Sequence, residues 1–194
     1  MPFIYACEGI YSRDIPTIEP IEAPFPFGSI EEFETWLRGT YIPRTFAIEY
    51  VTNPITGVII DVKKTECLGI FSSDGIFERC CQKYPDTRVP EFEKFLRGKI
   101  LSHNHPIYNP FGTTLSCEDI RAWADLHMME LRVVTEHHTY LIKPINQTWP
   151  DSESLFEKIK RIYPSNTRDQ FNNRPDLRHR CFQLLAAEGL FKYE

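Results

Sequence analysis

The sequence predicts an α/β or α+β fold, with a mixed β-sheet flanked by helices and a C-terminal helical extension. The order of the predicted helices and strands indicates this class, and the composition indicates a single domain. Segments with helical spacing of apolar residues alternate with short segments rich in β-branched and aromatic residues. The chain of 194 residues is also 42% hydrophobic, which is enough for one domain with a sizeable core. The net charge of −5 gives no basic surface, so nucleic acid is an unfavoured partner.

The first part of the chain predicts an arm and then a helix. Residues 1–28 are rich in proline, which excludes helix interiors and central strands, so we expect an extended arm there. A helix is expected over 29–38. Ser29 suits the N-cap position, and Phe33 and Leu37 lie on one face of such a helix.

The middle of the chain predicts a strand-rich region that leads to two histidines. A hairpin is expected with strands at 45–52 and 57–63, because β-branched and aromatic residues flank an Asn-Pro-Ile-Thr-Gly turn. A weaker strand is expected at 67–72, and a mixed segment with short helices at 73–95. The apolar stretch 99–103 predicts a short strand.

The remainder predicts a helix, a hairpin and two further helices. Helical spacing of apolar residues extends over 116–130, and a hairpin is expected at 131–144. Charged amphipathic helices are expected at 151–163 and 175–191. The predicted organisation is a proline-rich arm at 1–28, a central domain at 29–147 and a C-terminal helical extension at 148–194.

The cysteines and the hydropathy pattern indicate the compartment. Six cysteines are scattered through the chain without a CxxC pair, so neither a disulfide framework nor a thiolate zinc site is expected. We expect reduced, buried thiols in a cytoplasmic protein. There is no apolar run of about 20 residues, which a membrane span needs, and the start does not resemble a secretory signal.

One stretch carries a pattern typical of a metal site. The residues at i and i+2 of a strand share a face, so His103 and His105 point to the same side while Asn104 points away. Asp119 lies in the first turn of the next predicted helix, which can fold back over the strand end. Two imidazoles and a carboxylate leave a fourth position open, which is the pattern of catalytic zinc sites.

Each half of this pattern also has an ordinary structural interpretation. Ser116 and Asp119 match a capping box, which needs no metal. Two histidines one residue apart also occur at strand ends without a ligand. Capping and metal binding are compatible, however, because a cap fixes the direction of the carboxylate at Asp119.

The combination SHNHP followed by SxxD resembles the signature of the JAMM/MPN+ (JAB domain) zinc metalloprotease family. The HNHP form is similar to that of RadC-type and other bacterial JAB proteins. The resemblance implies a JAB/MPN-like, cytidine-deaminase-like fold in which His103, His105 and Asp119 bind Zn²⁺. It also implies that Ser116 supports the oxyanion. The loop between His105 and Ser116 has ten residues, three more than the family pattern, in a turn-rich stretch.

The resemblance further implies a distant glutamate as general acid/base. Glu49 is the first candidate, because it interrupts an apolar strand pattern, FAIEYV, and lies 54 positions before His103. Glu66 is the alternative, 37 positions before His103. Glu49 can also be an ordinary solvent-facing strand residue.

The expected activity is zinc-dependent hydrolysis of a peptide or isopeptide bond. The substrate would be a protein or peptide tail, and a ubiquitin-like modifier is one candidate. Two alternatives remain open: a RadC-like protein associated with DNA, which the acidic balance disfavours, and a non-catalytic MPN-type binding scaffold. The remaining candidate side chains are interpreted as packed, solvated or directed away from the site: Cys117, His127, His137 and His138.

Overall fold

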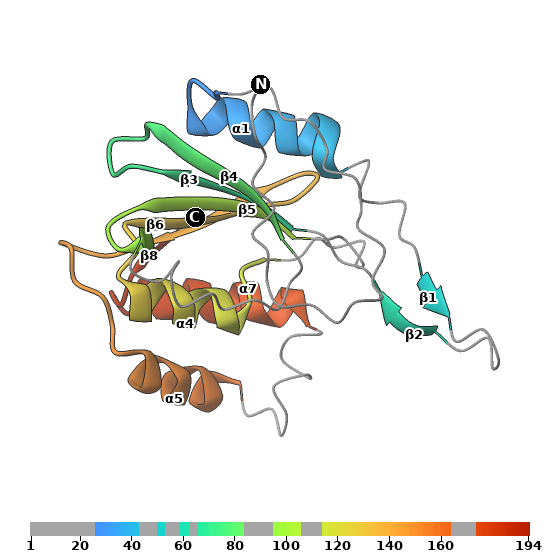
Figure 1. Cartoon of the computed structure of the whole chain (residues 1–194). Helices are drawn as coiled ribbons and strands as arrows, with labels where there is room; N and C mark the ends of the chain where they lie inside the picture. Colours follow the sequence, from blue (N-terminus) through green and yellow to red (C-terminus); the bar gives the residue numbers. More distant parts are fainter. Residues whose placement is uncertain are drawn as a thin grey trace.

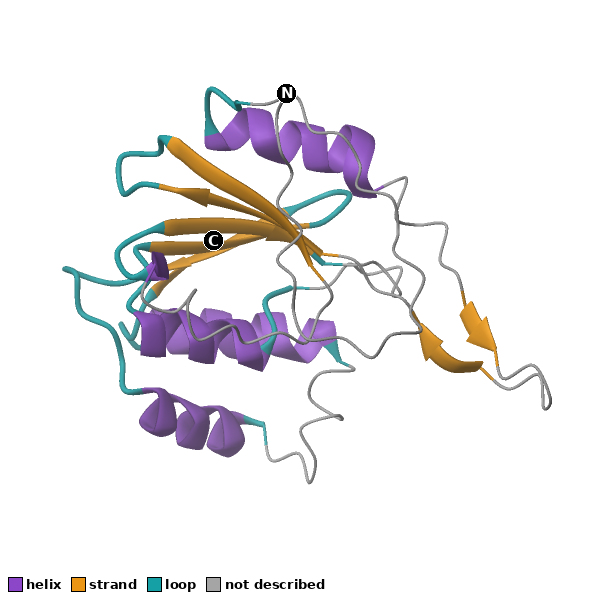
Figure 2. Cartoon of the chain, in the orientation of Figure 1, coloured by secondary structure: helices purple, strands orange, loops and turns teal. Residues whose placement is uncertain are grey.

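The computed structural model describes residues 26–42, 50–52, 59–62, 66–83, 95–105, 114–163 and 174–194. Its centre is an open mixed sheet of six strands in the order β4-β3-β5-β6-β7-β8 (Figures 1 and 2). β5 and β6 are parallel, and the other neighbouring pairs are antiparallel. The strands are β3 (Glu66–Phe71), β4 (Phe77–Lys83), β5 (Ile100–Asn104), β6 (Glu130–Val134), β7 (Thr139–Lys143) and β8 (Lys192–Tyr193).

Helices cover both faces of this sheet (Figure 1). α1 lies on one face, α4 and α7 lie on the other, and α5 packs on the outer side of α4. The helical elements are α1 (Ile30–Trp36), the π-helix η1 (Leu37–Tyr41), α4 (Cys117–Leu126), α5 (Ser152–Ile162) and α7 (Pro175–Ala187). A separate antiparallel pair consists of β1 (Tyr50–Thr52) and β2 (Ile59–Val62). The predicted α+β class, with a mixed sheet flanked by helices, is confirmed.

A hydrophobic core lies on each side of the sheet. On the α1 side, Phe33 is fully buried and packs with Phe71 of β3 and with Trp36. On the α4 side, Trp123 is fully buried and contacts Phe191, which precedes β8. The C-terminal residues therefore belong to the same core as α4, and β8 extends the same sheet.

The helix expected over 116–130 is shorter than predicted. It ends at Leu126, and His127 adopts a left-handed conformation with φ of 52°. Met128 is buried but lies beyond the helix, and Glu130 already begins β6. The apolar spacing of Met128 fits a helix, but this residue packs from the connection instead, so the periodicity overestimated the helix length.

The pairing of strands confirms one expectation and corrects two others. The expected strand at 67–72 is present as β3, between β4 and β5. In the segment 73–95, expected to be mixed with short helices, residues 77–83 form β4 against β3, and residues 84–94 lie outside the described residues. Residues 192–193 form β8 where only a helical extension was expected. In these segments, pairing with a neighbouring strand outweighs a weak local propensity for another secondary structure.

The expected helix at 29–38 starts as predicted, because the Ser29 side chain accepts a hydrogen bond from the N–H of Glu32. It continues past Gly39 as η1, which ends at Tyr41. The proline-rich arm falls mostly on residues 1–25, outside the described residues. Among the residues that the structure describes, no helix has the length and apolar character required to cross a membrane.

Candidate metal centre

The two histidines lie at the end of a strand in the interior of the sheet. β5 pairs with β3 on one side and β6 on the other, and all of its residues are buried. Alternation along the strand places His103 and His105 on the face covered by α4. His105 follows the last residue of β5, and its N–H donates to the carbonyl of Val134 at 3.2 Å. Both histidine backbones are therefore held by the sheet.

The carboxylate comes from the first turn of α4. Ser116 is the N-cap, and its Oγ accepts a hydrogen bond from the N–H of Asp119 at 3.1 Å. Asp119 Oδ2 accepts in return from the N–H of Ser116 at 2.6 Å and from its Oγ at 2.7 Å. The capping box predicted from the sequence is present, and it fixes the direction of the Asp119 carboxylate.

The C-terminal strand supports the segment that precedes this cap. Thr114 Oγ1 and the hydroxyl of Tyr193 share a hydrogen bond of 2.5 Å. Both side chains are largely withdrawn from solvent, and the Tyr193 hydroxyl also contacts His179 Nδ1 at 2.8 Å. β8 and α7 therefore help to fix the N-terminus of α4.

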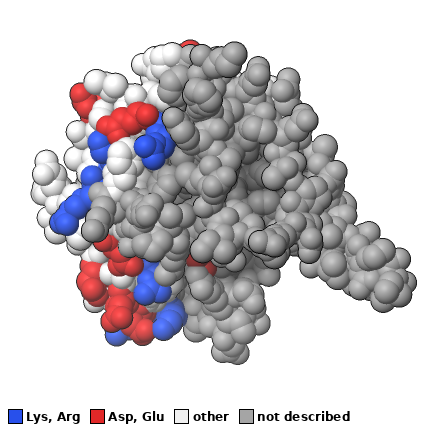
Figure 3. Space-filling model, viewed as in Figure 1, with Lys and Arg blue, Asp and Glu red and all other residues white. Residues whose placement is uncertain are grey.

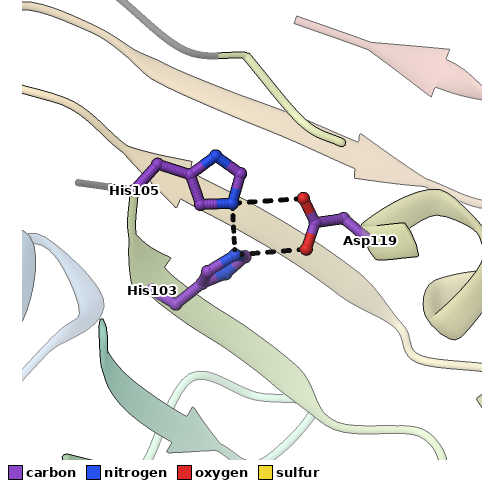
Figure 4. Close-up of side chains that lie close together, drawn as sticks. All are labelled: His103, His105 and Asp119. Atoms are coloured by element: carbon purple, nitrogen blue, oxygen red, sulfur yellow. Dashed lines mark hydrogen bonds and ion pairs between the residues drawn. The ribbon is translucent and has the colours of Figure 1, made fainter. Parts of the chain in front are cut away.

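The strand end and the helix start bring three potential ligands together (Figure 4). His103 Nε2 lies 3.3 Å from Asp119 Oδ1, and His105 Nε2 lies 3.2 Å from Asp119 Oδ2. The two Nε2 atoms are 3.1 Å apart. The three side chains are only 3%, 11% and 17% exposed for His103, His105 and Asp119. The site is thus largely shielded but retains an accessible side.

Electrostatics keep the carboxylate ionised. Burial alone would raise the pKa of the Asp119 carboxyl, but attraction to His105 and hydrogen bonds with both histidines outweigh it. The pKa of this carboxyl therefore lies well below its ordinary value. The buried Arg178 of α7 also interacts with Cys117 and Asp119; burial lowers the pKa of its guanidinium, and these two groups oppose that shift. The Asp119 carboxylate is therefore ionised and could serve as a ligand to a cation.

The donor set fits a tetrahedral cation. Imidazole nitrogen and carboxylate oxygen are zinc ligands with bond lengths of ~2.0 Å, for which neighbouring ligand atoms are separated by ~3.3 Å. The separation of 3.1 Å between the two Nε2 atoms agrees with that edge length. Each of them also lies close to one carboxylate oxygen of Asp119: His103 Nε2 is 3.3 Å from Oδ1, and His105 Nε2 is 3.2 Å from Oδ2. Three protein ligands leave a fourth position for water or substrate. The residues predicted from the sequence therefore form a group that could hold a metal ion.

Of the two candidate glutamates, only Glu66 lies within the part of the chain that the structure describes. Glu49 lies outside the described residues. Glu66 is the first residue of β3, two positions before Leu68, and Leu68 is the register partner of His103. In the antiparallel register of these two strands, the backbone of position 66 therefore lies toward the end of β5 that carries the histidines.

The other histidines lie away from this group. His127 is the C-cap of α4, and its ring packs edge-on against the ring of Trp149, with 5.2 Å between the ring centroids. His137 is exposed and lies 3.8 Å from Glu136 at the hairpin turn. Cys117 is buried in the core on the α4 side. The described cysteine side chains are buried, as expected, at Cys67, Cys80, Cys117 and Cys181.

The sequence analysis missed two features on the opposite face of β5. Asn104, taken only as a residue that points away, is fully buried, and its Oδ1 accepts from the N–H of Cys67 at 2.7 Å. Glu34 of α1 is also buried and pairs with Arg132 of β6 at 2.6 Å. Asparagine is depleted in strands, so its place between two histidines was a signal of a specific role.

Comparison with known proteins gives no assignment: no family model, curated protein or solved structure matches the chain. The fold and the site therefore define the class as far as it is established. This is an α+β protein with a His-His-Asp group that could bind a metal ion.

Proposed function

We propose that this protein is a zinc-dependent hydrolase of the JAMM type that cleaves a peptide or isopeptide bond. One observation carries the proposal. His103, His105 and Asp119 converge with ligand spacing at the junction of a strand end and a capped helix. The mixed sheet with helices on both faces is consistent with a JAB/MPN-like fold. We also propose a cytoplasmic location, with which the buried position of the described cysteine side chains is consistent.

The protein groups have separate roles in this proposal. His103, His105 and Asp119 would hold Zn²⁺, which when bound lowers the pKa of water toward ~7 and polarises a carbonyl. The Ser116 hydroxyl, 2.7 Å from Asp119 Oδ2, can turn to donate to the oxyanion that develops on the scissile carbonyl. A glutamate takes the proton from the attacking water and passes it to the leaving amine.

We assign that general acid/base role to Glu66, although chain spacing alone favours Glu49. The reason is register: β3 pairs with β5, and the backbone of Glu66 is two residues from Leu68, the register partner of His103. A general acid/base must come within reach of the water that it deprotonates, so we favour the glutamate on the strand that pairs with the histidine strand.

The substrate class in this proposal is a protein or peptide, with a lysine side-chain amide of a ubiquitin-like conjugate as one candidate bond. Nucleic acid is not the proposed partner. On the face drawn in Figure 3, described Lys and Arg side chains lie among Asp and Glu side chains. The net charge of −5 also disfavours binding to phosphate backbones.

The test uses the full chain loaded with Zn²⁺ and a mixture of linear and lysine-branched isopeptides, with cleavage read by mass spectrometry. We expect cleavage that a zinc chelator stops and that Zn²⁺ restores. Glu66→Gln should keep zinc and lose activity by more than 100-fold, whereas the matched variant Glu49→Gln should remain active. Loss in Glu49→Gln alone would overturn the Glu66 assignment, and failure of the folded protein to bind zinc would overturn the whole proposal.

A further inference from the structure

The ladder between β3 and β5 changes character beside the metal ligands. Backbone pairing runs from Phe71 opposite Ile100 to Leu68 opposite His103. One residue further, the N–H of Cys67 donates to the side-chain Oδ1 of Asn104 at 2.7 Å. A side-chain amide therefore accepts the hydrogen bond at the point where the paired register ends.

The other side of β5 does not change in this way. Asn104 remains in register with Val134 of β6, and the next N–H, from His105, donates to the Val134 carbonyl. The histidine pair is thus fixed by β6, and the beginning of β3 is attached to the same strand end through Asn104. Asn104 and Cys67 are both fully buried, so this hydrogen bond is shielded from competing water.

We propose that Asn104 is a positioning residue that holds the start of β3, and with it the backbone of Glu66, at the strand end that carries the two histidines. The inference rests on the proposed function, in which Glu66 transfers the proton. The N–H of Cys67 belongs to the peptide bond that joins Glu66 to Cys67, so a hydrogen bond to this group fixes the backbone of Glu66 directly. The side chain of Asn104 lies on the opposite face of β5 from the histidines, so in this proposal it acts through the backbone of β3.

The residue type suits this role. An amide oxygen accepts the hydrogen bond without bringing a charge into a fully buried position. Alanine would leave the N–H of Cys67 without this acceptor, so the start of β3 could move relative to the histidines. Leucine has the same number of side-chain heavy atoms and the same branching as asparagine, but it is larger and has no acceptor. It leaves no cavity, so a loss that alanine and leucine share reflects the hydrogen bond rather than lost packing.

Ser102 provides a matched control on the same strand. It is also fully buried and shares the face of Asn104, but its Oγ donates to Glu34 Oε1 at 3.0 Å instead of contacting β3. A defect that arises from any buried polar substitution on this face should appear in Ser102→Ala as well. A defect that arises from the position of Glu66 should appear only at Asn104.

The experiment measures kcat, KM and zinc content for zinc-loaded wild type, Asn104→Ala, Asn104→Leu and Ser102→Ala. We expect both Asn104 variants to lose about 10- to 100-fold in kcat, the range typical of residues that orient a catalytic group, with KM and zinc content unchanged. Ser102→Ala should retain kcat within about threefold of wild type.

A double variant tests whether Asn104 acts through Glu66. If it does, Asn104→Ala combined with Glu66→Gln should be no less active than Glu66→Gln alone. The amide of Cys67 should also exchange with deuterium faster in Asn104→Ala than in Ser102→Ala, which reports the hydrogen bond independently of turnover.

The outcomes separate this inference from the proposed function. Zinc-dependent hydrolysis by wild type together with unchanged kcat in both Asn104 variants would overturn the inference alone. Additive losses in the double variant would do the same. Absence of zinc-dependent hydrolysis in wild type would overturn both proposals.

Discussion

The two faces of β5 carry buried polar groups with opposite chemical character. On the α1 face, the carboxylate of Glu34 pairs with the guanidinium of Arg132 and accepts hydrogen bonds from Ser102 and Thr139. On the α4 face, the carboxylate of Asp119 faces the imidazoles of His103 and His105. Both carboxylates lie close to the same five-residue strand.

The difference lies in the partners of the two carboxylates. Arginine is always charged, so Glu34 and Arg132 neutralise each other within the protein and serve the packing of α1 on the sheet. Histidine can be neutral and then presents a ring nitrogen to a metal ion. The α1 face of the sheet beside β5 thus holds ion pairs whose charges are matched within the protein, since Arg132 also pairs with Glu130 at 2.9 Å. The α4 face holds a group that could accept an external cation. The following predictions test this contrast.

The largest effect on stability is expected when the ion pair between Glu34 and Arg132 is broken. Arg132→Met leaves the Glu34 carboxylate buried without its cation, which should lower the free energy of unfolding by about 3–5 kcal/mol. Urea unfolding measures this loss. The double variant with Glu34→Met should recover only part of it, because Glu130 has also lost its contact with Arg132, and zinc content should not change. A loss below about 1 kcal/mol would contradict a buried, desolvated pair.

The next effect concerns the close packing of α1 on β3. A Cβ added to Gly69 would lie 2.6 Å from Cε1 of Phe33, whose ring is fully buried. Gly69→Ala should therefore lower the free energy of unfolding by about 1–3 kcal/mol. Gly39→Ala is the matched control, because no atom lies within 4 Å of its added Cβ. Thermal unfolding that shows equal effects for both variants would contradict this account of the packing.

The two serine caps separate helix stability from metal binding. Ser116→Ala and Ser29→Ala each remove an N-cap hydrogen bond, so each should lower the free energy of unfolding by about 1 kcal/mol. Only Ser116 also donates to the Asp119 carboxylate, so Ser116→Ala alone should weaken zinc affinity, by about 10-fold or more. Competition with a zinc chelator measures the affinity, and equal affinities in the two variants would mean that the cap does not orient the ligand.

The smallest effect is a pH dependence in the core on the α4 side. Burial raises the pKa of the Cys181 thiol to about 11. The thiol thus favours the folded state below its unfolded pKa of about 8.5, and this contribution is lost as pH rises toward 11. The stability advantage of wild type over Cys181→Ala should therefore shrink between pH 8 and pH 11 in urea unfolding. A constant difference would show that this thiol is not desolvated.

The sequence predicted the parts of the molecule that depend on local periodicity. Strand alternation placed His103 and His105 on one face, and the capping pattern placed Asp119 in the first turn of α4. These are short-range rules, and the site lies between two adjacent elements, so they were sufficient to assemble it. The role of these residues in catalysis stays a prediction.

Features that depend on distant pairing were not predictable in the same way. Glu34 and Arg132 are 98 positions apart, and nothing local to either residue identifies the other. β4 is a strand because β3 provides a partner, although its own residues suggested a mixed segment. β8 likewise depends on β7. Only the three-dimensional sheet order brings these segments together, since local propensity is weak.

The claim that His103, His105 and Asp119 form a zinc site is tested most directly by measuring zinc binding to variants of these ligands and of Ser102, on the opposite face of β5. Metal content is measured by plasma mass spectrometry after incubation with Zn²⁺ and dialysis, with folding checked by circular dichroism. We predict about one zinc ion per chain in wild type and Ser102→Ala, and almost none in His103→Ala and Asp119→Ala. A folded wild type that takes up no zinc, or retention of zinc in both ligand variants, would contradict the account.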